Sequence, residues 1–95
     1  MLRTAQAEYR GIVDYLCVTL GNRGAASRFA GEFKSQVDLI RSHPYMRGLS
    51  RLSEAAALGY RSCPVGNYVL LYKVRDDAIV LAHVFHQSQD YARLV

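Results

Sequence analysis

Several ionisable side chains in the second half of the chain could cleave RNA through the ribose 2′-hydroxyl group. That reaction needs a general base, an acid for the leaving group and a cation beside the phosphate. Histidine and tyrosine can transfer protons, and arginine and lysine can hold a phosphate oxygen. The residues of these types are His83, His86, Tyr91, Lys73, Arg61 and Arg75. If the chain is an endoribonuclease, we predict His86, Tyr91 and Arg61 as its catalytic residues.

The same side chains also have structural explanations. His83 and His86 are three residues apart, which in a strand places them on opposite faces, so they cannot easily share a metal ion. No metal site and no cofactor are predicted. His86 could instead close a strand end by bonding to backbone or to Asp90. Arg61 could form a salt bridge within the chain; the candidate carboxylates are Asp14, Asp38 and Glu54.

Length and composition predict one folded domain over residues 1–95. The chain has 95 residues, of which 51% are hydrophobic and 21% charged, enough for a single core and too few for two domains. Its net charge is +4, and ten of its twelve basic residues are arginine because only Lys34 and Lys73 are lysine. No apolar run reaches the ~18 residues of a membrane span, and no signal-peptide pattern begins the chain. We therefore expect a cytoplasmic protein.

Two amphipathic helices are predicted in the first half of the chain. The first is expected to begin at a Thr4 cap and to stop at Gly21-Asn22, and the second to run from near Gly24 to Ser42-His43-Pro44. Apolar residues recur at helical spacing in both. In the first they are Ala5, Tyr9, Ile12, Val13, Leu16 and Leu20; in the second they are Ala26, Phe29, Phe33, Val37 and Ile40. Two helices joined by a short connection form an antiparallel hairpin.

The pattern changes to strands from Tyr60 onwards. Residues rich in Val, Leu, Ile and Tyr predict strands over Tyr60–Val65, Asn67–Arg75 and Ala78–His86, with Asp76-Asp77 as a tight turn between the last two. Helices followed by an antiparallel sheet indicate an α+β fold with the helices on one face of the sheet.

A two-residue turn also predicts the strand register. It places Arg75 opposite Ala78 and Asn67 opposite His86, so that Lys73, Arg75 and His86 share an exposed face. The bulkier face should pack on the helices; it carries Tyr68, Leu70, Tyr72, Val74, Ile79, Leu81, His83 and Phe85. A slip of one residue would reverse this assignment.

The ordered set of motifs resembles the ParE toxins of bacterial type II toxin–antitoxin modules, within the RelE/ParE superfamily. Those proteins carry a GYR motif, a small-residue turn, an aliphatic stretch ending in FYRV and a closing VLHQ with an acidic residue soon after. The matching segments here are Gly59-Tyr60-Arg61, Leu71-Tyr72-Lys73-Val74 and Val84–Asp90, together with Ala5-x-Ala7-Glu8, Gly24-Ala25-Ala26 and His43-Pro44. The resemblance also implies a short strand before the first helix. Because Met1 lies almost at the helix start, this strand is expected to be short or missing.

The resemblance leaves two activities to distinguish. ParE toxins inhibit DNA gyrase, whereas the RelE branch cleaves mRNA on the ribosome. RelE enzymes carry an arginine just after the tyrosine that here is Tyr68, where this chain has Val69. They also carry basic residues after the last strand, where this chain reads Gln87–Asp90. Both departures favour a gyrase inhibitor that is not an enzyme; an inactive, degenerate toxin is the third alternative.

The resemblance implies a cognate antitoxin similar to ParD, with a ribbon-helix-helix DNA-binding part and an acidic tail that wraps the toxin. Direct sequence-specific DNA binding is then expected only through that antitoxin, and no membrane partner is expected. The predicted target-binding residues are Arg61, Lys73, Arg75, His86, Tyr91 and Arg93.

Overall fold

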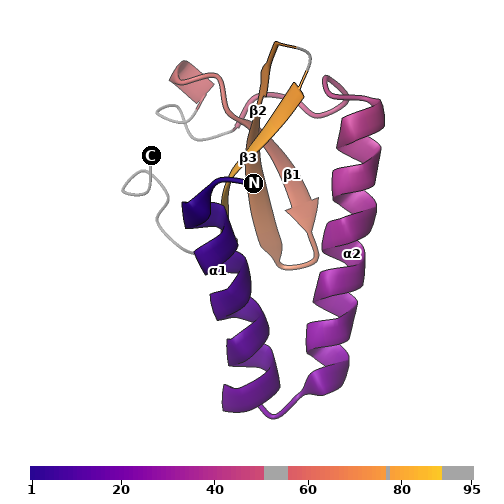
Figure 1. The fold of residues 1–95 in the computed structure, drawn as a ribbon, viewed down its shortest axis with the longest axis vertical. Coiled ribbons are helices and arrows are strands. Elements are labelled where there is room, and N and C mark those ends of the chain that lie inside the picture. Colours follow the sequence, from indigo (N-terminus) through magenta and orange to yellow (C-terminus); the bar gives the residue numbers. More distant parts are fainter. Residues whose placement is uncertain (51–55, 77, 89–95) are drawn as a thin grey trace.

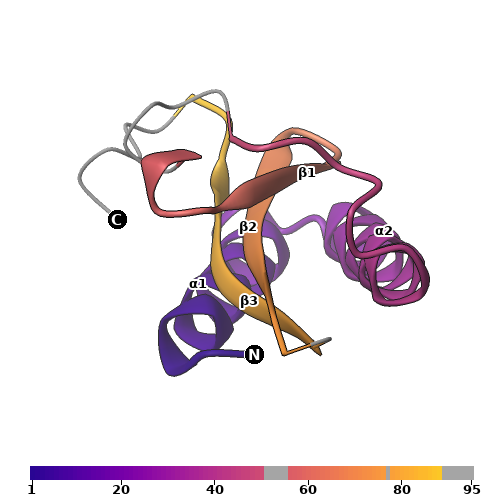
Figure 2. The same cartoon turned by 90° about the horizontal axis from the view of Figure 1, so that it is seen from above.

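The computed structural model describes residues 1–50, 56–76 and 78–88. It confirms the predicted α+β fold, in which two helices pack on one face of a three-stranded antiparallel sheet of order β1-β2-β3 (Figures 1 and 2). The elements are α1 (Arg3–Asp14), η1 (Tyr15–Thr19), α2 (Arg23–Ser42), β1 (Arg61–Val65), β2 (Tyr68–Arg75) and β3 (Ala78–His86). Within the described residues, no helix is both long and apolar enough to cross a bilayer.

The helical hairpin forms as predicted, but its caps differ. The N-cap of α1 is Leu2, which makes no side-chain capping bond, so the predicted Thr4 cap is wrong. Asn22 caps α2 instead, since its Oδ1 accepts the N–H of Ala25 at 2.9 Å. Gly21 permits the sharp connection because it adopts φ +60°, a left-handed conformation that costs glycine little.

The end of the first helix widens into the π-helical turn η1. There the N–H of Leu20 bonds to the carbonyl of Tyr15, five residues back. The wider turn rotates the side chains, so Leu16 remains buried while Val18 is 79% exposed and Leu20 is 55% exposed. The predicted burial of Leu20 is therefore wrong, because the 3.6-residue spacing on which it rested does not continue through η1.

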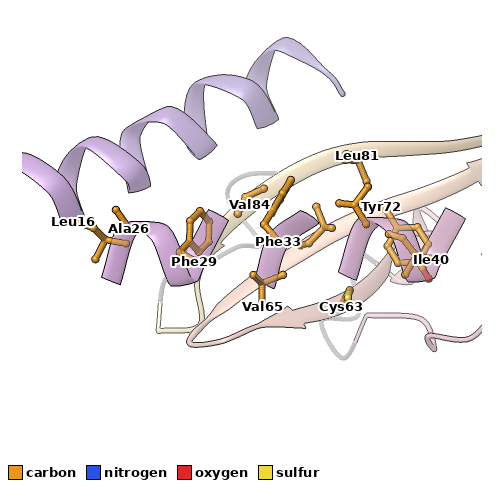
Figure 3. Close-up of a cluster of buried hydrophobic side chains, with 12 residues drawn as sticks. Leu16, Ala26, Phe29, Phe33, Ile40, Cys63, Val65, Tyr72, Leu81 and Val84 are labelled. Atoms are coloured by element: carbon orange, nitrogen blue, oxygen red, sulfur yellow. The ribbon is translucent and has the colours of Figure 1, made fainter. Parts of the chain in front are cut away.

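The core lies between the two helices and the sheet (Figure 3). All five apolar residues predicted for the second helix are buried in it, namely Ala26, Phe29, Phe33, Val37 and Ile40. Tyr9 of α1 joins the helices, with its ring centroid 5.5 Å from that of Phe29 and 4.7 Å from that of Phe33. Sheet side chains complete the core; they are Cys63, Val65, Leu70, Tyr72, Leu81 and Val84.

The register of the β2–β3 hairpin is only half as predicted. Near the turn the pairs run as expected, from Arg75 with Ala78 to Lys73 with Val80. A β-bulge then follows, and beyond it Leu71 pairs with His83 and Tyr68 pairs with His86. This shift of one residue exchanges the faces of the rest of β3.

The bulge therefore corrects three predicted positions. His83 pairs with Leu71 on the face of the sheet away from the helices, not on the helix side. Phe85 does not face the helices; it packs with Leu71, Tyr60 and Val69 on the opposite face of the sheet. His86 does not share the outward face with Lys73 and Arg75, because its partner Tyr68 packs against the helix-side core. His83 and His86 nevertheless lie on opposite faces, as predicted from their spacing.

Short contacts cover both outer edges of the sheet. Beside β3, the N–H of Leu2 donates to the carbonyl of Leu81 at 3.0 Å, and within the described residues no strand precedes α1. Beside β1, Leu49 forms an isolated bridge with Arg61, and the N–H of Ser50 donates to the carbonyl of Tyr60 at 2.9 Å. Bonds of this kind occupy edge groups that could otherwise pair with another chain.

Candidate functional site

The predicted site residues that the structure describes lie in three separate places. Arg61 lies where β1 begins, Lys73 and Arg75 lie on the sheet face away from the helices, and His86 lies at the end of β3 on the helix side. Tyr91 and Arg93 lie outside the described residues. The structure therefore does not bring Arg61 and His86 together.

Arg61 binds the segment that follows α2. Its Nη1 donates to the carbonyl of Arg47 at 2.6 Å, and its guanidinium carbon lies 4.9 Å from the centroid of the Tyr45 ring. Neither Asp14 nor Asp38 pairs with it in the described part of the chain, and Glu54 lies outside that part. Tyr72 supports the same segment, because its hydroxyl donates to the carbonyl of Pro44 at 2.9 Å. Arg61 thus joins β1 to the connection after α2.

Lys73 and Arg75 border a shallow hollow on the outward face of the sheet. Lys73 Nζ lies 4.4 Å from the centroid of the Tyr60 ring, a cation–π contact. The hollow has a volume of about 210 Å³ and is lined by Leu2, Tyr60, Lys73, Arg75, Val80 and Ala82. Two cations beside an aromatic ring and small apolar side chains suit a carboxylate or phosphate group of a partner.

His86 lies at the junction of two hollows under the helical hairpin. One, of about 560 Å³, lies against α1 and η1, and the other, of about 290 Å³, lies against α2; both are lined by Tyr68 and His86. The two rings meet edge to face, with centroids 5.3 Å apart. The N–H of Ser88 donates to His86 Nδ1 at 3.1 Å, and the Ser88 hydroxyl lies 2.7 Å from the same nitrogen. This backbone bond is the strand-end role predicted for His86.

Glu8 is a site-forming residue that the sequence reasoning did not single out. Its Oε1 accepts the N–H of Val84 at 3.1 Å, just beyond the bulge, and lies 3.4 Å from His83 Nδ1. The partners are 76 residues apart in sequence. The motif Ala5-x-Ala7-Glu8 contained this residue, but nothing local indicated that its carboxylate reaches β3.

Comparison with known proteins decides the family. A family model for the ParE toxin of the type II toxin–antitoxin system parDE matches residues 1–91. The chain belongs to the ParE toxin family. Toxin ParE1 of Caulobacter vibrioides is 31% identical to it over 88 residues, which are 93% of this chain and 86% of that relative. The resemblance drawn from the sequence motifs is thereby confirmed.

In this ParE-family chain, no group of three or more His, Cys, Asp and Glu side chains in the described ranges could hold a metal ion. Both cysteines are free. Cys63 is fully buried and Cys17 is half-buried, and Cys63 Sγ lies 3.3 Å from Gln36 Oε1. Arg47 Nη2 donates to the same Gln36 oxygen at 2.9 Å. These polar groups connect α2, the segment after it and β1.

Burial raises the pKa of two neighbouring core groups of this ParE-family chain. The pKa of the Cys63 thiol is raised above its ordinary value of 9.0, chiefly by desolvation, which the nearby Arg47 partly opposes. The pKa of the Tyr72 hydroxyl is raised above 10.0, again chiefly by desolvation. At the pH at which the unfolded chain begins to lose these two protons, both groups are therefore still neutral in the folded state.

We expect the free energy of unfolding to fall as the pH rises above about 9. Between the unfolded and folded pKa values of Cys63, the folded state retains a proton that the unfolded state has lost, so added base favours unfolding. Each such proton contributes a slope of up to about 1.4 kcal/mol per pH unit. Urea unfolding at pH 8, 9 and 10 should show a shallower decline for Cys63→Ala than for the parent. Cys17→Ala is the control, and identical slopes for parent and Cys63→Ala would contradict the expectation.

Proposed function

We propose that this ParE-family toxin inhibits DNA gyrase in the cytoplasm without acting as an enzyme, and that a ParD-like antitoxin neutralises it. The observation that carries the proposal is the match of the ParE toxin model to residues 1–91. The relative whose alignment covers 93% of this chain, at 31% identity, is named Toxin ParE1. Since the match spans both helices and all three strands, it concerns the whole fold rather than one motif.

The positions of the predicted catalytic residues support a mode of action without catalysis. Arg61 pairs with Tyr72 and His86 pairs with Tyr68, on opposite sides of β2. Four residues along a strand and two strand spacings across it place their Cα atoms about 16 Å apart. The Arg61 guanidinium is bound to the carbonyl of Arg47 and lies over the Tyr45 ring, so it is not placed beside His86 as a general acid–base mechanism with a supporting cation requires.

The charge of the chain supports an acidic partner. Its net charge is +4, and Lys73 and Arg75 border the hollow beside Tyr60. An acidic antitoxin tail would be attracted to such a surface, and the attraction would weaken with added salt. We propose that gyrase contacts the predicted target-binding residues Arg61, Lys73, Arg75, His86, Tyr91 and Arg93.

A gyrase supercoiling assay run beside an mRNA cleavage assay tests the proposal. The parent toxin should inhibit supercoiling and leave mRNA intact. Combined Lys73→Ala and Arg75→Ala substitutions should raise the inhibitory concentration about tenfold, the effect of losing about 1.4 kcal/mol of binding. Lys34→Ala is the matched control, because Lys34 is an exposed cation on α2 that pairs with Asp38.

Two other results would replace the proposal. Cleaved mRNA that disappears with His86→Gln in a folded protein would identify a RelE-type ribonuclease, since loss of a general acid or base typically lowers the rate ~10²–10⁴-fold. A folded protein that neither inhibits gyrase nor cleaves RNA would be an inactive toxin. In each case the circular dichroism spectrum of the protein serves as the check of correct folding.

A further inference from the structure

The bulge in β3 determines which face of the sheet carries His86. Before the bulge Tyr72 pairs with Leu81, and after it Leu71 pairs with His83, which leaves Ala82 without a partner in the ladder. Without this extra residue the register near the turn would continue, and His86 would face outward with Lys73 and Arg75. With it, His86 lies opposite Tyr68 and lines both hollows under the hairpin.

Two hydrogen bonds from the first helical segment lie on either side of the bulge. On one side the N–H of Leu2 donates to the carbonyl of Leu81, and on the other Glu8 Oε1 accepts the N–H of Val84. The Glu8 side chain is 20% exposed and lines the larger of the two hollows beside His86. A charge-assisted bond to a backbone N–H is stronger than a neutral one. Glu8 thus fixes the outer edge of β3 where its register changes.

His83 is the second residue of β3 that lies close to the Glu8 carboxylate. Its Nδ1 lies 3.4 Å from Glu8 Oε1 without the alignment of a hydrogen bond, and its ring meets Tyr60 with centroids 6.2 Å apart. His83 therefore packs on the face opposite His86, which is where the shifted register places it. The amide of Val84 is the aligned donor to Glu8, so the backbone of β3 is the group that this carboxylate positions.

We propose that Glu8 is a positioning residue. Its carboxylate holds the β3 bulge in register and so places His86 beside Tyr68, at the junction of the two hollows under the helical hairpin. Its importance for toxicity rests on the proposed function, in which His86 contacts the target. The claim that Glu8 sets the register does not depend on that function, because it concerns only the backbone of β3 and the face of the sheet on which His86 lies. The two claims need separate measurements.

The test compares Glu8→Ala and Glu8→Gln in the full chain, by NMR and by gyrase supercoiling. Alanine removes the acceptor, so we expect the Val84 amide to exchange about tenfold faster. We also expect loss of the nuclear Overhauser contact between the Tyr68 and His86 rings, and a shift of the His86 ring nitrogen resonances, which report the bond between Nδ1 and Ser88. Glutamine retains an acceptor oxygen and should keep all three features. Inhibition of supercoiling should weaken about tenfold with alanine and remain near the parent value with glutamine.

Asn22→Ala is the matched control, since Asn22 Oδ1 accepts the N–H of Ala25 at 2.9 Å, a similar bond from a side chain to a backbone amide at a residue that lines neither hollow beside His86. It should leave the His86 signals unchanged. If Glu8→Ala does not fold, Glu8→Asp retains the charge with a shorter reach and should lose the same ring contact. Retention of that contact and of Val84 protection in a folded Glu8→Ala or Glu8→Asp variant would overturn the proposal. Loss of both with unchanged gyrase inhibition would uphold the positioning role and instead refute His86 as a target contact.

Discussion

Replacement of Phe33 by alanine is expected to leave much of the isolated toxin unfolded at 37 °C. Phe33 is 7% exposed and lies where α2 meets α1, with its ring centroid 4.7 Å from that of Tyr9 and 6.1 Å from that of Phe29. Truncation of a buried phenylalanine to alanine costs about 3–5 kcal/mol. Domains have a total stability of about 5–15 kcal/mol, and small ones bury proportionally less surface. The loss would therefore remove most of the stability.

Urea unfolding followed by circular dichroism measures this effect. Leu39→Ala is the matched control, because Leu39 is an apolar residue on the same helix but is 44% exposed. Its substitution should change the free energy of unfolding by about 0.5 kcal/mol or less. A Phe33→Ala variant that unfolds at the same urea concentration as Leu39→Ala would show that the contact between the helices is not part of the stabilising core.

Addition of the cognate antitoxin is expected to raise the melting temperature of the toxin by about 15–30 °C. Binding to the folded state alone adds about 4 kcal/mol when free partner is present at 1,000 times its Kd. In a domain of this size each kcal/mol corresponds to about 4–8 °C. The free chain has large apolar groups for a partner to cover, because Val18 is 79% exposed and Tyr45 is 67% exposed.

Differential scanning calorimetry at several antitoxin concentrations checks this expectation. The melting temperature should rise with antitoxin concentration and should rise less at high salt, because exposed charges are screened. A ParD-like protein from an unrelated module serves as the control. An unchanged melting temperature at saturating antitoxin would contradict both the stabilisation and the proposed partnership.

Local sequence patterns were sufficient to predict the helices, the strands and the family. The apolar spacing from Ala26 to Ile40 requires one buried face of a helix, and the structure buries all five of its residues. The strand runs were located to within one residue at their beginnings, because alternating branched and aromatic side chains favour strands over a short stretch. The motifs that carried the resemblance to ParE toxins are likewise short and ordered along the chain, and the family match confirms that resemblance.

Only the tertiary structure decided which residues share a surface. The bulge after Leu81 reverses the rest of β3, and the carboxylate that accepts its Val84 amide lies 76 residues earlier in the chain. Within the described residues, Arg61 binds the carbonyl of Arg47 rather than Asp14 or Asp38, because the segment after α2 returns beside β1. The spacing of apolar residues indicates whether one segment is a helix or a strand. The strand register, and the face of the sheet on which each residue lies, depend instead on bonds between elements distant in sequence. The sequence by itself therefore determined the elements and the family of this protein, and long-range packing decided which face His86 occupies.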